Sequence, residues 1–307
     1  MNNAGYSQPA RSSVRSRPKD TRHLSAEDDR AARYQTVALH ALAKLSAGDV
    51  RPKTVHRLRT HLRRLQAYLE LVGEDRNAEI MANCASRLSS FRTLQVFERY
   101  LTRLRAAPSD IRKVKDCIRK KRVKLDRSQV YLKIERRVRR HALSPTPASP
   151  DWMADRMEKL RREHAESLHE RISEATANPR RKTLHALRLK IKPIRYQEEW
   201  ALDQAYARPE IESRLKRAQS VLGDYEEHAQ FRKLARTLHL KSCARILKDW
   251  RRAKTRARTL PAKLTGLIDA LAGRGLRLVE SGLPSNRTTS HELRLAMARY
   301  GVAHPPA

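Results

Sequence analysis

The segment 52–73 carries leucines on one helix face and cations nearly opposite. At 3.6 residues per turn, four leucines fall on one face: Leu58, Leu62, Leu65 and Leu69. The other side carries a stripe of His56, Arg59 and Arg63, with Arg64 beside it. The pattern predicts an amphipathic helix that buries its leucines. A charged face opposite a leucine face is commonly only solvated, so one copy says little about function.

The same pattern occurs again 129 residues later (185 − 56). His185, Arg188 and Lys192 repeat the spacing of His56, Arg59 and Arg63, and apolar residues again occupy the other face. The offset also relates Arg33 to Arg162 and His40 to His169, as the sequence shows upstream of both segments. We interpret this as an internal duplication. Positions three and seven residues after each histidine share its helix face and can reach one ligand.

These motifs resemble the CHAD domain family (conserved histidine α-helical domain), whose signature H-x-x-R-x-x-x-[RK]-[RK]-x-R occurs in two halves. The first match is carried by His56, Arg59, Arg63 and Arg64, and the second by His185, Arg188, Lys192, Arg195 and Tyr196. Residues 215–223 resemble the family element L-K-x-x-Q-x-x-L-G, and the likeness covers roughly residues 26–260. The resemblance implies an all-α fold of two helical bundles related by a pseudo-two-fold axis, with the signature helices lining a central basic cleft or pore.

The sequence departs from the family pattern at several positions. Where the family has R-D-x-D-V, the chain reads Arg92-Thr93-Leu94-Gln95-Val96, so both acids are lost. Gln66 replaces the last arginine of the first signature, and Pro193 replaces a basic residue of the second. The N-D element of the second half reads Glu226-Glu227. Fewer acids near the stripe leave it less neutralised, so anion binding should persist.

Net charge restricts the possible partners. The 307 residues carry 67 Lys and Arg against 33 Asp and Glu, a formal charge of +34. Inorganic polyphosphate, nucleic acid and an anionic membrane surface are the candidate polyanions. No apolar run approaches the about 20 residues needed to span a bilayer, so we expect no membrane insertion. Cys84, Cys117 and Cys243 form no C-x-x-C pair, which fits a reducing cytoplasm and argues against a disulfide framework or a zinc cluster.

Turn residues and apolar periodicity divide the chain. Residues 1–25 form a predicted disordered basic arm, 26–280 the folded domain and 281–307 a flexible tail. The domain divides into repeats at 26–143 and about 151–280, joined by the proline-rich linker 144–150. The predicted helices cover about 26–46, 52–73, 75–90, 92–106, 109–141, 151–177, 179–206, 210–222, 224–238, 242–258 and 261–279.

Dense cations without aromatic platforms suit a phosphate chain, because arginine forks and lysine point charges bind phosphate oxygens. Aromatic residues make up 5% of the chain and do not interleave with the stripe arginines, which favours polyphosphate over single-stranded nucleic acid. We expect inorganic polyphosphate to bind Arg59, Arg63, Arg64, Arg188, Lys192 and Arg195, with His56 and His185 as hydrogen-bond donors. Second-tier candidates are Lys190, Arg33, Arg162, His40 and His169.

Catalysis is not expected, because phosphoanhydride hydrolysis normally needs carboxylates that hold divalent ions, and the stripes contain none. His185 has no carboxylate nearby in the sequence, so we expect no metal site and no cofactor. We expect a non-catalytic polyphosphate binder, associated with polyphosphate granules in a bacterial cytoplasm. A helical nucleic-acid-binding protein and a phosphohydrolase are the alternatives. The sequence specifies no oligomeric state.

Overall fold

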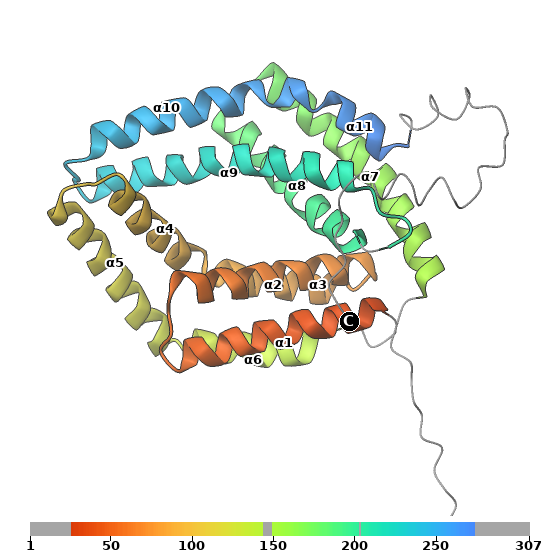
Figure 1. Cartoon of the computed structure of the whole chain (residues 1–307), viewed down its shortest axis with the longest axis horizontal. Coiled ribbons are helices and arrows are strands. Elements are labelled where there is room, and N and C mark those ends of the chain that lie inside the picture. The colour runs from red at the N-terminus through yellow and green to blue at the C-terminus, as the bar shows by residue number, and fades with distance from the viewer. Residues whose placement is uncertain (1–25, 144–148, 203, 274–307) are drawn as a thin grey trace, which may run out of the picture.

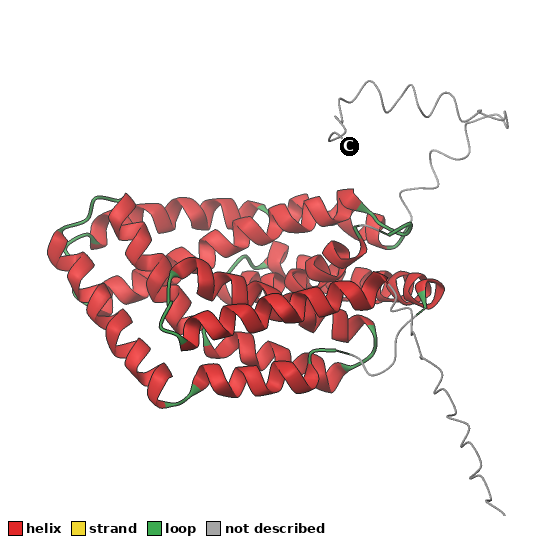
Figure 2. Ribbon diagram, turned by 60° about the horizontal axis from the view of Figure 1, so that its bottom comes forward, coloured by secondary structure: helices red, strands yellow, loops and turns green. Residues whose placement is uncertain are grey.

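The computed structural model describes residues 26–143, 149–202 and 204–273, and every regular element in them is a helix (Figure 2). The all-α prediction is therefore confirmed. The predicted arm 1–25, linker residues 144–148 and the tail 281–307 lie outside the described residues. The helices are α1 (Ala26–Ser46), α2 (Pro52–Leu71), α3 (Asp75–Arg87), α4 (Ser89–Arg103), α5 (Pro108–Arg127), α6 (Val130–His141), α7 (Pro150–Ala177), α8 (Arg181–Ala201), α9 (Pro209–Thr237), α10 (Cys243–Thr259), the 3₁₀ helix η1 (Pro261–Lys263) and α11 (Thr265–Leu271).

Two apolar cores organise these helices. One lies mainly among α1, α2, α3 and α6, with the start of α7 and the end of α8 packed into it, and includes the leucine face of α2, which is fully buried as predicted. The other lies among α7, α8, α9, α10 and α11, and includes Leu187, Ile191 and Ile194 of α8. The cores stabilise the fold by removing these faces from water. In Figure 1, α1, α2, α3 and α6 lie on one side, and α7 to α11 on the other.

A third apolar cluster joins the two sides at the end where α4 and α5 meet α9 and α10 (Figure 1). Phe97 of α4 stacks on Phe231 of α9 with ring centroids 4.9 Å apart, and Tyr100 lies 5.0 Å from the same ring. The sides also meet where α2 packs against α8. The two sides are therefore fixed at two separate places, and α2, α4, α8 and α9 are held in fixed relation.

The segment predicted as one helix over 109–141 is two helices. The chain breaks at Ser128 and Gln129, where Gln129 adopts a left-handed conformation with φ 51°. The break lets α5 pack against α4 while α6 turns to pack against α1 and α3. Apolar periodicity continues on both sides of the break, which is why the sequence pattern did not reveal it.

Two other predictions about helix ends were wrong. Gly223 does not stop a helix, because α9 runs from Pro209 through it to Thr237. Buried Leu222 and Tyr225 flank it and hold this part of α9 against the core. The predicted helix 261–279 is instead η1 followed by the short α11, and residues beyond 273 lie outside the described part. α8 continues through Pro193.

Asp110 connects α5 to the start of α10. Its buried carboxylate accepts hydrogen bonds from the backbone nitrogens of Lys241 (3.0 Å) and Ser242 (2.9 Å) and from the Ser242 hydroxyl (2.8 Å). Burial alone raises the pKa of Asp110, but these hydrogen bonds outweigh it and leave the pKa below 3.8. The ionised carboxylate thus stabilises the junction of the two sides.

Replacing Asp110 by alanine should lower the free energy of unfolding at neutral pH by about 3 kcal/mol, because two buried backbone donors lose their acceptor. The folded-state pKa lies below 3.8, so this stabilisation is present above pH 3.8 and is lost as pH falls through the lowered pKa. Urea unfolding of both proteins across this range measures the difference. Asp116→Ala is the control, since that side chain is 45% exposed. Equal destabilisation by the two substitutions would contradict the prediction.

Candidate functional site

Cations from three helices face one another where α2 packs against α8. We call Arg59 and Arg63 of α2, Arg92 of α4, and Arg188 and Lys192 of α8 the central cluster. The charges of Arg63, Arg92 and Arg188 each lower the pKa of Arg59. Those of Arg59, Arg63 and Arg188 likewise lower the pKa of Lys192. Within the described part of the chain, none of the five forms an ion pair within 4 Å. The cluster therefore concentrates positive charge that no ion pair neutralises.

Several guanidinium nitrogens in the central cluster lack hydrogen-bond partners. These atoms are themselves buried: Nε of Arg59, Arg63 and Arg188 and Nη1 of Arg92 have no acceptor among the described residues. Arg63 donates only from Nη1, to Gln66 Oε1 at 2.6 Å. Unpaired buried donors are costly, and phosphate oxygens would satisfy them well.

Crowding of like charge changes the acidity of the cluster. Burial, together with the charges of Arg63, Arg188, Arg59 and Arg195, lowers the pKa of Lys192 to about 7. Burial and the neighbouring arginines lower the pKa of Arg59 to about 10. A lysine with such a pKa is only partly charged at neutral pH. An anion placed in the cluster would favour its protonated form.

The two signature histidines have different surroundings. The His56 side chain is exposed. Partial loss of hydration and the charges of Arg92 and Arg59 lower its pKa, so it is mostly neutral at pH 7. His185 Nδ1 lies 3.6 Å from Glu226 Oε2 of α9. The expectation that His185 lacks a carboxylate neighbour was therefore wrong, because helix packing brings α9 against α8. Glu226 also pairs with Arg181 at 2.9 Å, so this carboxylate lies between an arginine and a histidine.

A pocket of about 140 Å³ lies between α2 and α8 beside the cluster, lined by Arg63, Gln66, Ala67, Glu70, Leu189, Lys192, Pro193 and Tyr196. Glu70 accepts from Gln66 Nε2 (2.6 Å) and Gln197 Nε2 (3.1 Å). Burial raises the pKa of Glu70 despite these hydrogen bonds. Because Gln66 also accepts from Arg63, the glutamine predicted as a departure from the signature links this arginine to Glu70.

Arg64 and Arg195 lie apart from the central cluster in their pairing. Both contact Glu199, which accepts from Arg64 Nε at 2.8 Å and lies 2.9 Å from Arg195 Nη2. Arg64 also stacks over Tyr34, and Arg195 over Tyr196. Glu199 thus bridges α2 and α8. Arg195 also lies 3.5 Å from Glu212, so the two arginines share two carboxylates. The phosphate role predicted for these two arginines stays a prediction.

The second-tier residues are dispersed. Burial is the main cause of the lowered pKa of Lys190; the charge of Arg171 of α7 lowers it further, and that of Glu163 of α7 raises it. Arg33 and Arg162 are exposed on α1 and α7. His40 lines a pocket next to α2, and His169 lines a different pocket with Glu166 and Ile268. The structure does not bring these five residues into the central cluster.

Arg92 belongs to the cluster and was absent from the predicted site. The only sequence signal was its place in the segment that aligns with R-D-x-D-V. The two positions that lost their acids make other contacts: Thr93 donates to Gln230 of α9 at 3.1 Å, and buried Gln95 donates to the Val50 carbonyl at 2.7 Å. Glu227 of α9 is the carboxylate whose charge acts on Arg92.

The described residues were also examined for the features of a metal site and of a membrane-spanning helix. Among the described residues, no three or more His, Cys, Asp or Glu side chains gather as they would to bind a metal ion. None of the helices in the same residues combines the length and apolar character that crossing a bilayer requires.

The chain is similar to known proteins in both sequence and fold. The family model for the CHAD domain matches residues 30–229. The fold is similar to the crystal structure of the CHAD domain from the plant Ricinus communis, with a TM-score of 0.53, 15% identity and coverage of 79% of this chain and 89% of that one. No curated protein sequence matches the chain significantly. Since the family model covers well over half of the residues, the chain belongs to the CHAD domain family.

Proposed function

We propose that this protein is a non-catalytic binder of inorganic polyphosphate, and that the central cluster holds the phosphate chain. The observation that carries the proposal is the group of five cations without ion pairs, four of which have unpartnered buried guanidinium nitrogens. A phosphate chain supplies an anionic oxygen acceptor at every unit. It would therefore satisfy these donors and relieve the repulsion among the cations at once.

Nucleic acid is the competing ligand, and the aromatic rings near the cluster argue against a single-stranded one. Cζ of Arg64 lies over the Tyr34 ring, 5.0 Å from its centroid, and Cζ of Arg195 lies over the Tyr196 ring at 4.1 Å. An arginine thus covers one face of each ring, and Tyr196 is buried, which leaves little aromatic surface for base stacking. Duplex binding through phosphates alone is the remaining alternative and is tested below.

Two carboxylates near the cluster favour binding over hydrolysis. Glu199 holds Arg64 and Arg195, and Glu226 holds Arg181. Each of these carboxylates already neutralises an arginine, whereas a hydrolase of phosphoanhydrides needs carboxylates directed at divalent ions. We further propose that the protein acts in the cytoplasm, where binding to long phosphate chains would place it at polyphosphate granules.

The double variant Arg59→Ala and Arg188→Ala should weaken polyphosphate binding by about a hundredfold, because each arginine supplies charge-assisted hydrogen bonds of about 1.5–3 kcal/mol. Titration calorimetry measures the affinity, and raised salt is used because it reduces nonspecific electrostatic attraction. Lys120→Ala with Lys124→Ala is the matched control, since it removes two exposed charges from α5. Wild-type affinity in the double variant would refute the proposed site.

A competition experiment between polyphosphate and duplex DNA distinguishes the proposed ligand from nucleic acid. We expect polyphosphate to displace duplex DNA from the wild-type protein at raised salt. Displacement in the opposite direction would establish the nucleic-acid alternative instead. Release of free phosphate from polyphosphate in the presence of magnesium would identify a phosphohydrolase.

Affinity for polyphosphate should fall as pH rises above 7. The pKa of free Lys192 is about 7, so binding above that pH must take up a proton at this lysine. One proton changes the affinity by at most about tenfold per pH unit. Lys192→Arg keeps the charge at all these pH values, so its affinity should stay flat between about pH 7 and about pH 9. Equal pH profiles for the two proteins would show that Lys192 is not the titrating group.

A further inference from the structure

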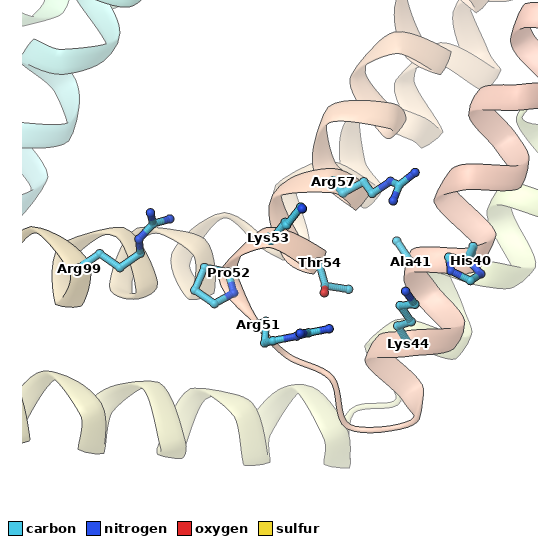
Figure 3. Close-up of a pocket in the computed structure, with 9 residues that line it drawn as sticks. All are labelled: His40, Ala41, Lys44, Arg51, Pro52, Lys53, Thr54, Arg57 and Arg99. Atoms are coloured by element: carbon cyan, nitrogen blue, oxygen red, sulfur yellow. The ribbon is translucent and has the colours of Figure 1, made fainter.

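A second basic pocket lies on another flank of α2, away from the central cluster. It has a volume of about 550 Å³, and its lining contains no carboxylate (Figure 3). Its cationic side chains come from α1, from the turn before α2 and its first turns, and from α4, as Figure 3 shows. We call it the flank pocket; it is lined by His40, Ala41, Lys44, Arg51, Pro52, Lys53, Thr54, Arg57 and Arg99.

One carboxylate organises the rim of the flank pocket. Asp49 accepts from Arg51 at Nε (2.7 Å) and Nη2 (2.8 Å), and from the Thr54 hydroxyl at 3.2 Å. Arg51 holds the pKa of Asp49 far below its usual range, so Asp49 is ionised and neutralises that arginine. The turn that leads into α2 is thereby fixed against the first turn of the helix.

The other cations of the flank pocket are not neutralised. Lys44, Lys53, Arg57 and Arg99 form no ion pair within 4 Å in the part of the chain that the structure describes. The first turn of α2 contains no acidic residue either, although helix N-termini favour negative charge. The pocket thus combines concave shape, several free cations and the positive end of a helix, which together suit a flexible anion.

The flank pocket is electrostatically continuous with the central cluster. Arg99 lies two turns after Arg92 on α4, and its charge lowers the pKa of Arg92. Lys53 lies one turn before His56 on α2. A row of cations therefore leads from the cluster along α2 and around its N-terminus. At 1.5 Å per residue, the ten residues from Lys53 to Arg63 span about 15 Å.

We infer that the flank pocket is a second anchor for the same polyphosphate chain, reached only by chains long enough to extend beyond the central cluster. The inference rests on the proposed function. Tripolyphosphate is too short to occupy both places at once, whereas a long flexible chain held in the cluster would meet the pocket at high effective concentration. The protein would then discriminate phosphate chains by length, through avidity between two sites.

The test compares tripolyphosphate with long-chain polyphosphate in titration calorimetry at raised salt. The flank variant is Lys44→Ala with Arg57→Ala, both exposed, so it should fold as the wild type does. We expect it to lose at least about tenfold in affinity for the long chain, and to keep wild-type affinity in the tighter binding step for tripolyphosphate. The control Lys120→Ala with Lys124→Ala removes the same charge and should leave both affinities close to wild type.

Two outcomes would overturn the inference. In one, the flank variant binds the long chain as the control does, and in the other, it loses affinity equally for both ligands. The variant Arg59→Ala with Arg188→Ala separates this failure from that of the proposed function. If that variant binds both ligands normally, the central cluster is not the polyphosphate site and the proposed function itself fails.

Discussion

The contact between α2 and α8 is the constraint on which the rest of the structure depends, because it presses cations of like charge together. Burial, together with the repulsion among these cations, lowers the pKa values of Lys192 and Arg59. Attraction elsewhere in the same contact opposes it. Trp200 of α8 packs 4.9 Å from the Tyr68 ring of α2, and Glu199 bridges Arg64 and Arg195. The helices remain together because apolar packing and one carboxylate lie at one end of the contact while the repulsion lies at the other.

The helical period of α2 explains how one helix can do this. Its leucines fill the core of α1, α2, α3 and α6. Arg59 and Arg63 lie on the side that meets α8, whereas Arg57 lies about 120–160° around the helix axis and lines a pocket together with residues of α1. Each face meets a different neighbour, so the cations of one helix are divided between two environments.

Periodicity predicted what depends on local sequence. It placed Leu58 and Leu62 in the core and Arg59 and Arg63 on a common face, and the structure agrees. It could not place Arg92 beside them, because that contact depends on how α4 crosses α2. It could not show the break at Gln129 either, where apolar spacing continues while the chain changes direction. The internal duplication stays a prediction from the sequence.

The positions of the acids, more than those of the bases, decide which cations are available for a ligand. With 67 basic and 33 acidic residues, about half of the cations cannot have an acidic partner of their own, so an unpaired cation alone carries little information. The buried arginines are different, since Arg161 is held by Glu198 at 2.7 Å and Arg208 by Glu158 at 2.9 Å. Arg161 is fully buried and Arg208 largely so, and both pairs follow the rule that buried charges are compensated. The central cluster breaks that rule at four buried guanidinium nitrogens in three helices. Such uncompensated charge destabilises the free protein, and a bound polyanion is the compensation that its geometry accepts.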